Sequence, residues 1–133
     1  MNNLYESHLW LERAEDTLHA SDINLKNDLL LASVNRAYYA MFYYAIALLR
    51  SENIITKSHS GTFSKFSELF IKTNRISIQY SSNFRKAFEY RQSVDYDIEA
   101  HVSEGECELL LENAREFYSF TKIYLEKLSS NTI

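Results

Sequence analysis

A run of 13 residues without a charged side chain, Ala37 to Leu49, constrains the fold more than any other feature of the chain. A helix from about Asp28 to Arg50, which includes this run, carries apolar and aromatic side chains on every face. Such a helix has to be covered by other helices or by a second subunit. Because a membrane-spanning helix needs roughly 20 apolar residues, the run predicts a buried central helix and no membrane association.

The rest of the chain favours further helices around this one. The 133 residues include no proline and only two glycines, so almost nothing interrupts a helix. Apolar spacing predicts four more helices and no strand: one up to about Leu18, one around Phe63 to Phe70, one from about Ser77 to near Val94, and one that starts at a Ser103 and Glu106 capping box. The polar stretch Ser21 to Asn27 is expected to separate the first two helices. These patterns predict an all-α fold, an up-and-down antiparallel helical bundle of four to five helices, in a single domain over residues 1–133.

The net charge and the cysteine and histidine content limit the kinds of function that the chain can have. A net charge of −4 argues against a broad surface for duplex nucleic acid and limits any RNA contact to a local site. The single cysteine, Cys107, makes no internal disulfide, which favours the cytoplasm. The four histidines, His8, His19, His59 and His101, lack the spacing of metal ligands, so we expect no metal site and no cofactor.

Charged residues on otherwise apolar helices are the first candidates for a site. Arg36 stands at the head of the aromatic run, and Arg91 falls on the apolar stripe of the fourth helix. A buried guanidinium needs an acceptor, and Asp95 follows Arg91 by one helical turn. One interpretation is therefore structural, in which Arg36 or Arg91 pairs with Asp95 and fixes the helix register.

The other interpretation is a phosphate pocket. Arg36, Lys57 or Arg91 would bind the anion, and Tyr96 or His59 would supply a proton. The residue types alone allow both interpretations.

Three segments, Asn35 to Tyr43, Lys57 to Gly61 and Arg91 to Asp97, in this order and spacing, resemble the HEPN superfamily, and more narrowly its small bacterial and archaeal members. The resemblance extends from about Leu9 to Leu128. It implies a helical bundle that often forms a homodimer. It also implies a two-gene toxin–antitoxin pair with a small nucleotidyltransferase and, in many members, a metal-independent ribonuclease.

The chain departs from the family's catalytic signature, an arginine followed after four to six residues by a histidine. After Arg91 these positions hold Tyr96, Asp97 and Ile98, and His101 lies too far along. Tyrosine, with an ordinary pKa near 10, is a poor base at neutral pH.

The resemblance and this departure together imply a non-catalytic or degenerate HEPN module. It would bind a nucleotide, an RNA end or a partner protein, and pairing with a small nucleotidyltransferase in a toxin–antitoxin or defence system is one setting that the resemblance implies. Two alternatives stay open. One is a divergent metal-independent ribonuclease toxin in which Arg91 anchors the phosphate and His59, Asp95 or Tyr96 transfers the proton; the other is a structural dimeric adaptor.

Overall fold

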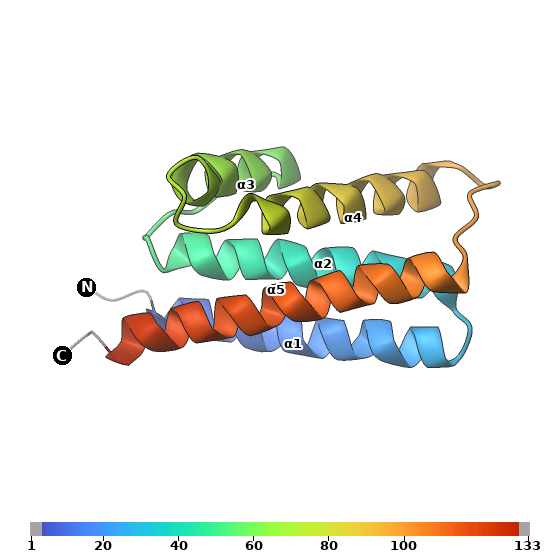
Figure 1. The fold of residues 1–133 in the computed structure, drawn as a ribbon, viewed down its shortest axis with the longest axis horizontal. Helices are drawn as coiled ribbons and strands as arrows, with labels where there is room; N and C mark the ends of the chain where they lie inside the picture. Colours follow the sequence, from blue (N-terminus) through green and yellow to red (C-terminus); the bar gives the residue numbers. More distant parts are fainter. Residues whose placement is uncertain (1–3, 131–133) are drawn as a thin grey trace.

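The computed structural model describes residues 4–130, which form α-helices, one π-helical segment and no strand (Figure 1). The elements are α1 (Leu4–Lys26), α2 (Leu30–Arg50), α3 (His59–Phe66), the π-helix η1 (Ser67–Ile71), α4 (Ile78–Tyr96) and α5 (Glu104–Ser130). The predicted all-α fold is confirmed. None of the helices in this range combines the length and the apolar character that crossing a membrane requires.

Four long helices, α1, α2, α4 and α5, lie side by side along the long axis of the molecule, and consecutive ones run in opposite directions (Figure 1). The short α3 and η1 pack at the end of the bundle where α4 begins. Helix α2 contacts each of the other four α-helices, as its apolar sequence predicts. The polar connection 51–58 and the fold therefore place the start of α3 against α2 and α4.

The core is built from the aromatic side chains of several helices. Phe66, Phe84 and Phe117 are almost fully buried and meet one another from α3, α4 and α5. Between α1 and α2 the contact is made instead by small side chains such as Ala14 and Ala40, which let the two helices approach closely. The core therefore holds α2 at a fixed depth, with one side facing α1 and another facing α3 and α4.

The junction of α1 and α2 differs from the prediction. The polar stretch that begins at Ser21 is not a connection, because α1 continues to Lys26. Ser21 is buried and faces Ser33 on α2: each hydroxyl donates to the backbone carbonyl oxygen of the other residue at 2.8 Å, and the two Oγ atoms lie 3.1 Å apart. These serine side chains form hydrogen bonds between α1 and α2. Helix α1 can therefore continue through this polar stretch.

Several helices end without glycine. Asp28, Asn53 and Asn74 adopt left-handed backbone conformations with φ near 60°. After α1 the N–H of Leu29 donates to the carbonyl of Asn24 at 2.8 Å, and the N–H of Asp28 donates to Leu25 at 3.1 Å, which is the Schellman arrangement. Asparagine and aspartate tolerate this conformation better than other residues with a side chain.

The predicted capping box at the start of α5 is confirmed. Ser103 N–H donates to Glu106 Oε1 at 2.9 Å, and Glu106 N–H donates to Ser103 Oγ at 3.1 Å. Tyr90 on α4 also donates to Glu106, and these hydrogen bonds lower the pKa of the Glu106 carboxyl to about 2. The start of α5 is thus tied to α4.

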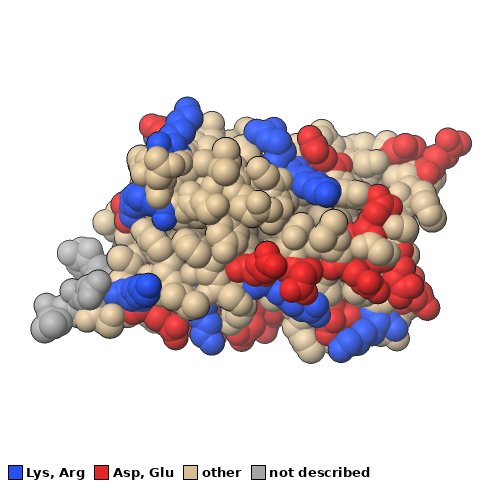
Figure 2. Space-filling view, viewed as in Figure 1, with Lys and Arg blue, Asp and Glu red and all other residues tan. Residues whose placement is uncertain are grey.

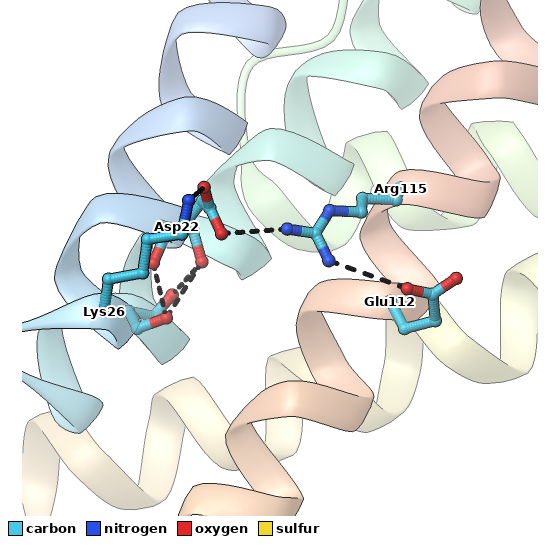
Figure 3. Close-up of polar contacts among 6 residues, drawn as sticks. Asp22, Lys26, Glu112 and Arg115 are labelled. Carbon is cyan, nitrogen blue, oxygen red and sulfur yellow. Dashed lines mark hydrogen bonds and ion pairs between the residues drawn. The ribbon is translucent and has the colours of Figure 1, made fainter. Parts of the chain in front are cut away.

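Charge is distributed unevenly over the surface. Figure 2 shows acidic residues gathered over the connection of α4 to α5 and over the first half of α5. On the outside of the bundle, Asp22 of α1 lies 2.9 Å from Arg115 of α5 and 3.0 Å from Lys26, and Arg115 lies 3.6 Å from Glu112 (Figure 3). The pair of Asp22 with Arg115 joins α1 to α5, the other two pairs each lie within one helix, and each pair contributes little on its own.

Candidate functional site

The side chain of Arg91 on α4 packs against α2. Its guanidinium carbon lies 5.5 Å from the ring centroids of both Tyr38 and Tyr39, within the range of cation–π attraction. Nη2 donates to the Tyr39 hydroxyl at 3.2 Å, and Nε lies 2.8 Å from Oδ2 of Asp95 one turn later on α4. Only 17% of the side chain is exposed. The fold thus immobilises the guanidinium against two phenol rings.

Most of the N–H donors of Arg91 make no hydrogen bond within residues 4–130. A guanidinium has five N–H donors, and within residues 4–130 this one donates a single hydrogen bond, to Tyr39. The Nε–H group is buried and has no hydrogen-bond partner, although Asp95 is at ion-pair distance. Arg91 therefore keeps donors for a further acceptor.

His59 reaches the same place from another helix. It is the first residue of α3, where Ser58 caps the helix by accepting the N–H of Gly61 at 2.9 Å. Its ring stacks on Phe42 at 4.3 Å between centroids, and its Nδ1 lies 2.8 Å from the Tyr38 hydroxyl in a hydrogen bond. Capping and stacking together fix the orientation of the imidazole.

The surroundings of His59 favour its neutral form. Burial lowers the pKa of His59, and the positive charge of Arg91 lowers it further. Because the ordinary value is about 6.5, the imidazole is mostly neutral at pH 7. Burial also raises the pKa of Tyr38, so this phenol stays protonated. His59 can accept a proton here, whereas Tyr38 serves as a fixed hydrogen-bond partner.

Arg91 and His59 both pack against Tyr38. The Arg91 guanidinium lies 5.5 Å and the His59 ring 5.9 Å from the centroid of the Tyr38 ring. An arginine and a histidine are thus brought together by tertiary packing, although the sequence after Arg91 lacks the histidine of the signature. We call Tyr38, Tyr39, His59, Arg91 and Asp95 the Arg91 cluster.

Two cavities adjoin His59. The larger, of about 550 Å³, is lined mainly by aromatic rings, and no carboxylate lines it. The smaller, of about 260 Å³, lies toward α1 and includes Lys57 at its edge. His59 and Ser58 line both. The residues around the larger cavity are Tyr38, Ser58, His59, Ser60, Phe63, Ser64, Phe84, Arg85 and Phe88.

The remaining predicted residues are not members of the Arg91 cluster, although the Arg36 guanidinium carbon lies 5.1 Å from the centroid of the Tyr39 ring. Arg36 donates to Asn35 Oδ1 from Nε at 3.1 Å and from Nη2 at 2.7 Å, and in residues 4–130 it forms no ion pair. Of the two predicted partners of Asp95, Arg91 forms the ion pair, whereas the guanidinium of Arg36 is bound by the neighbouring amide of Asn35. Lys57 is exposed. Tyr96 is 77% exposed at the end of α4, and no contact with Arg91 or His59 is present in the described part of the chain.

Tyr38 and Tyr39 are the residues that the sequence does not reveal as part of the site. Within an aromatic run they predict packing alone. The only signal in the sequence is general: a buried phenol needs a hydrogen-bond partner. In the structure these partners are His59 and Arg91, and the two tyrosines hold the cluster together.

Comparison with known proteins gives the family. The model of the HEPN domain matches residues 7–124. The chain is 37% identical to "Putative toxin MJ0142" of Methanocaldococcus jannaschii, over 86% of this chain and 78% of that protein. It is 36% identical to a UPF0332 protein of Thermotoga maritima, over 65% of this chain and 66% of that protein, and 34% identical to one of Gloeobacter violaceus, over 86% and 92%. A match over most of its length, on a helical bundle of this kind, shows that the chain belongs to the HEPN domain family.

Proposed function

We propose that this protein is a toxin-like HEPN module that binds a phosphate group of single-stranded RNA or of a nucleotide at the Arg91 cluster. Arg91 carries the proposal, because its guanidinium is oriented and largely buried yet keeps unused donors. A planar guanidinium with free donors suits the oxygens of a phosphate. The relative from M. jannaschii that carries the name of a toxin supports the biological setting.

A binding measurement with three variants tests the proposal. A short labelled single-stranded RNA is titrated with the wild-type protein and with Arg91→Ala, Arg91→Lys and Arg115→Ala. A charged hydrogen bond contributes about 1.5–3 kcal/mol, so Arg91→Ala should weaken binding by about 10- to 100-fold. Arg91→Lys should retain only part of the wild-type affinity, because lysine keeps the positive charge but lacks the paired N–H donors of the guanidinium. Arg115 lies in the exposed network between α1 and α5 and serves as the matched control. Equal affinity of Arg91→Ala and wild type would overturn the proposal.

We also propose that the working form is a homodimer. One face of α2 carries Tyr39, Phe42, Tyr43 and Ile46, which the other helices cover only in part. An apolar stripe of this kind on the central helix is suited to a two-fold contact with a second copy. Light scattering at micromolar concentration should give twice the mass of the chain, whereas the mass of one chain would contradict the dimer.

A second candidate function is RNA cleavage, and the environment of His59 favours it. The lowered pKa leaves the imidazole neutral, and in the tautomer in which Nδ1–H donates to the Tyr38 oxygen, Nε2 carries the lone pair that accepts a proton. His59 would take the proton of a ribose 2′-hydroxyl, whose oxygen attacks phosphorus. The 5′-oxygen would leave with a proton from water, while Arg91 stabilises the added negative charge.

Cleavage and binding are separated by one comparison. If His59 is the base, purified wild-type protein cuts RNA in the presence of a chelator, and His59→Gln binds RNA but does not cut it. If the protein only binds, neither form cuts RNA. Expression with and without a neighbouring nucleotidyltransferase gene, scored for growth arrest, tests the proposed cytoplasmic toxin–antitoxin pairing.

A further inference from the structure

The connection between α4 and α5 projects from the end of the bundle (Figure 1). Its apolar side chains are exposed to solvent. Ile98 is 102% exposed, and Tyr96 is 77% exposed. The turn is ordered by two hydrogen bonds: Glu99 N–H donates to Asp97 Oδ1 at 3.0 Å, and Ala100 N–H donates to the Asp97 carbonyl at 2.9 Å. The two exposed apolar side chains lie close together on an ordered turn and form a small apolar surface that a second molecule can cover.

The larger cavity beside His59 is complementary to this turn. Its walls are the rings of Phe63, Phe84 and Phe88, and its volume of about 550 Å³ accommodates the side chains of an isoleucine and a tyrosine. Arg85 stands at its edge, 4.6 Å from the centroid of Phe63, and within residues 4–130 it forms no ion pair. An apolar cavity with an unpaired cation at its edge suits an apolar segment that carries acidic residues.

We infer that the turn 96–99 of one copy inserts into the larger cavity of a second copy. Ile98 and Tyr96 fill the aromatic cavity, while Asp97 and Glu99 face Arg85 at its edge. The inference rests on the homodimer of the proposed function and adds to it a contact outside the α2 stripe. Each copy then contributes a wall of the space beside the other copy's His59.

The positions along α4 agree with a reciprocal exchange. Phe88 and Phe84 precede Arg91 by three and seven residues, which at 1.5 Å per residue places the cavity about 5–10 Å before it. Tyr96 follows Arg91 by five residues, about 8 Å beyond it on the same scale, and Ile98 lies farther along, past the end of α4. A two-fold axis near Arg91 therefore brings the turn of one copy over the cavity of the other, and the same contact forms twice.

The charge of this end of the molecule favours a protein partner over RNA. Asp97 and Glu99 belong to the connection of α4 to α5. Figure 2 shows acidic residues gathered over this connection and over the first half of α5. A strongly acidic surface repels phosphates. Arg85 of a second copy offers the opposite charge, and it precedes Arg91 by six residues as Asp97 follows Arg91 by six.

Cross-linking between two single variants tests the contact directly. Ile98→Cys and Ser64→Cys, the latter at the edge of the cavity, are purified separately, mixed and oxidised. A covalent dimer that contains one copy of each is expected. The native Cys107 is 1% exposed and should not react. Ile123→Cys, which places the thiol at an exposed apolar position of α5, replaces Ile98→Cys in the control.

Dimer affinity provides the second readout. Ile98→Asp should raise the dissociation constant of the dimer by about tenfold or more, because a buried isoleucine is lost, whereas Ile123→Asp should not. Arg85→Glu should also weaken the dimer, and adding Asp97→Arg should restore much of the loss. A monomeric protein, or a dimer without the Ile98 to Ser64 cross-link, would overturn the inference. RNA binding that still depends on Arg91 would then leave the proposed function standing.

Discussion

The junction of Ser21 with Ser33 and the Arg91 cluster both bury polar groups between α2 and another helix, but only the junction satisfies them. At the junction each hydroxyl donates to the other residue's carbonyl, and no donor is left over. In the Arg91 cluster the guanidinium donates one hydrogen bond, its Nε–H donates none, and His59 is held by Nδ1 alone.

The difference distinguishes buried polar groups that stabilise the fold from buried polar groups that can bind another molecule. A buried donor without an acceptor costs free energy, and in the Arg91 cluster a bound molecule can supply the missing acceptor. The junction is accordingly expected to affect stability and not binding. The Arg91 cluster should affect binding more than stability.

The largest expected effect on stability falls at the junction. Ser33→Ala removes one hydroxyl and leaves that of Ser21 with fewer partners, which should lower the free energy of unfolding by about 1–3 kcal/mol. Urea denaturation measures it. The double variant Ser21→Ala with Ser33→Ala should cost less than the sum of the single ones, since both partners are then gone. A loss of RNA affinity in Ser33→Ala would break the comparison.

A smaller and opposite pair of effects is expected at Asp95. The ion pair with Arg91 is partly exposed, so Asp95→Asn should lower the free energy of unfolding by less than about 1 kcal/mol. The same change removes a carboxylate that competes with phosphate for the guanidinium, so RNA binding should tighten. Thermal melting and RNA titration of one preparation check both. Reduced stability with unchanged binding would favour the structural adaptor.

The pH dependence of stability sharpens the role of His59. Its pKa is lower in the folded protein than the ordinary value of about 6.5, so below that pH the unfolded chain binds more protons. Stability should therefore be complete above about pH 6.5 and fall as the pH drops through the folded pKa. In His59→Gln this part of the pH dependence should vanish, as urea midpoints from pH 5 to 7.5 would show. An unchanged slope would place the titrating group elsewhere.

The smallest effect is expected at Arg36. Arg36 donates its hydrogen bonds to the adjacent Asn35 and also lies 5.1 Å from the centroid of the Tyr39 ring, so Arg36→Ala should lower the free energy of unfolding by about 0.5 kcal/mol and weaken RNA binding far less than Arg91→Ala. Urea denaturation and RNA titration measure these two quantities. If Arg36→Ala weakens binding as much as Arg91→Ala, the phosphate site extends beyond the cluster.

Local patterns predicted those parts of the fold that depend on neighbours in sequence. The capping box of Ser103 with Glu106 lies where expected, and the all-apolar α2 is central. The length of α1 was not predictable from its composition, because Ser21 finds its partner 12 residues away on another helix.

The candidate site also combines one contact that sequence spacing can predict with one that depends on the packing of distant helices. The approach of Arg91 to Asp95 is a one-turn relation that sequence can suggest. The approach of His59 to Tyr38 joins residues 21 positions apart and depends on where α3 packs. Spacing rules along one helix therefore miss the histidine that the fold brings beside Arg91.

The most direct test of the Arg91 cluster is an NMR titration of the arginine side chains. In protein labelled with ¹⁵N, the Nε–H resonance of Arg91, assigned by its loss in Arg91→Lys, is followed as short single-stranded RNA is added. The account predicts a saturable shift of this resonance, with that of Arg115 unchanged. A resonance of Arg91 that stays in place while RNA binds, or while other arginines shift, would contradict the account.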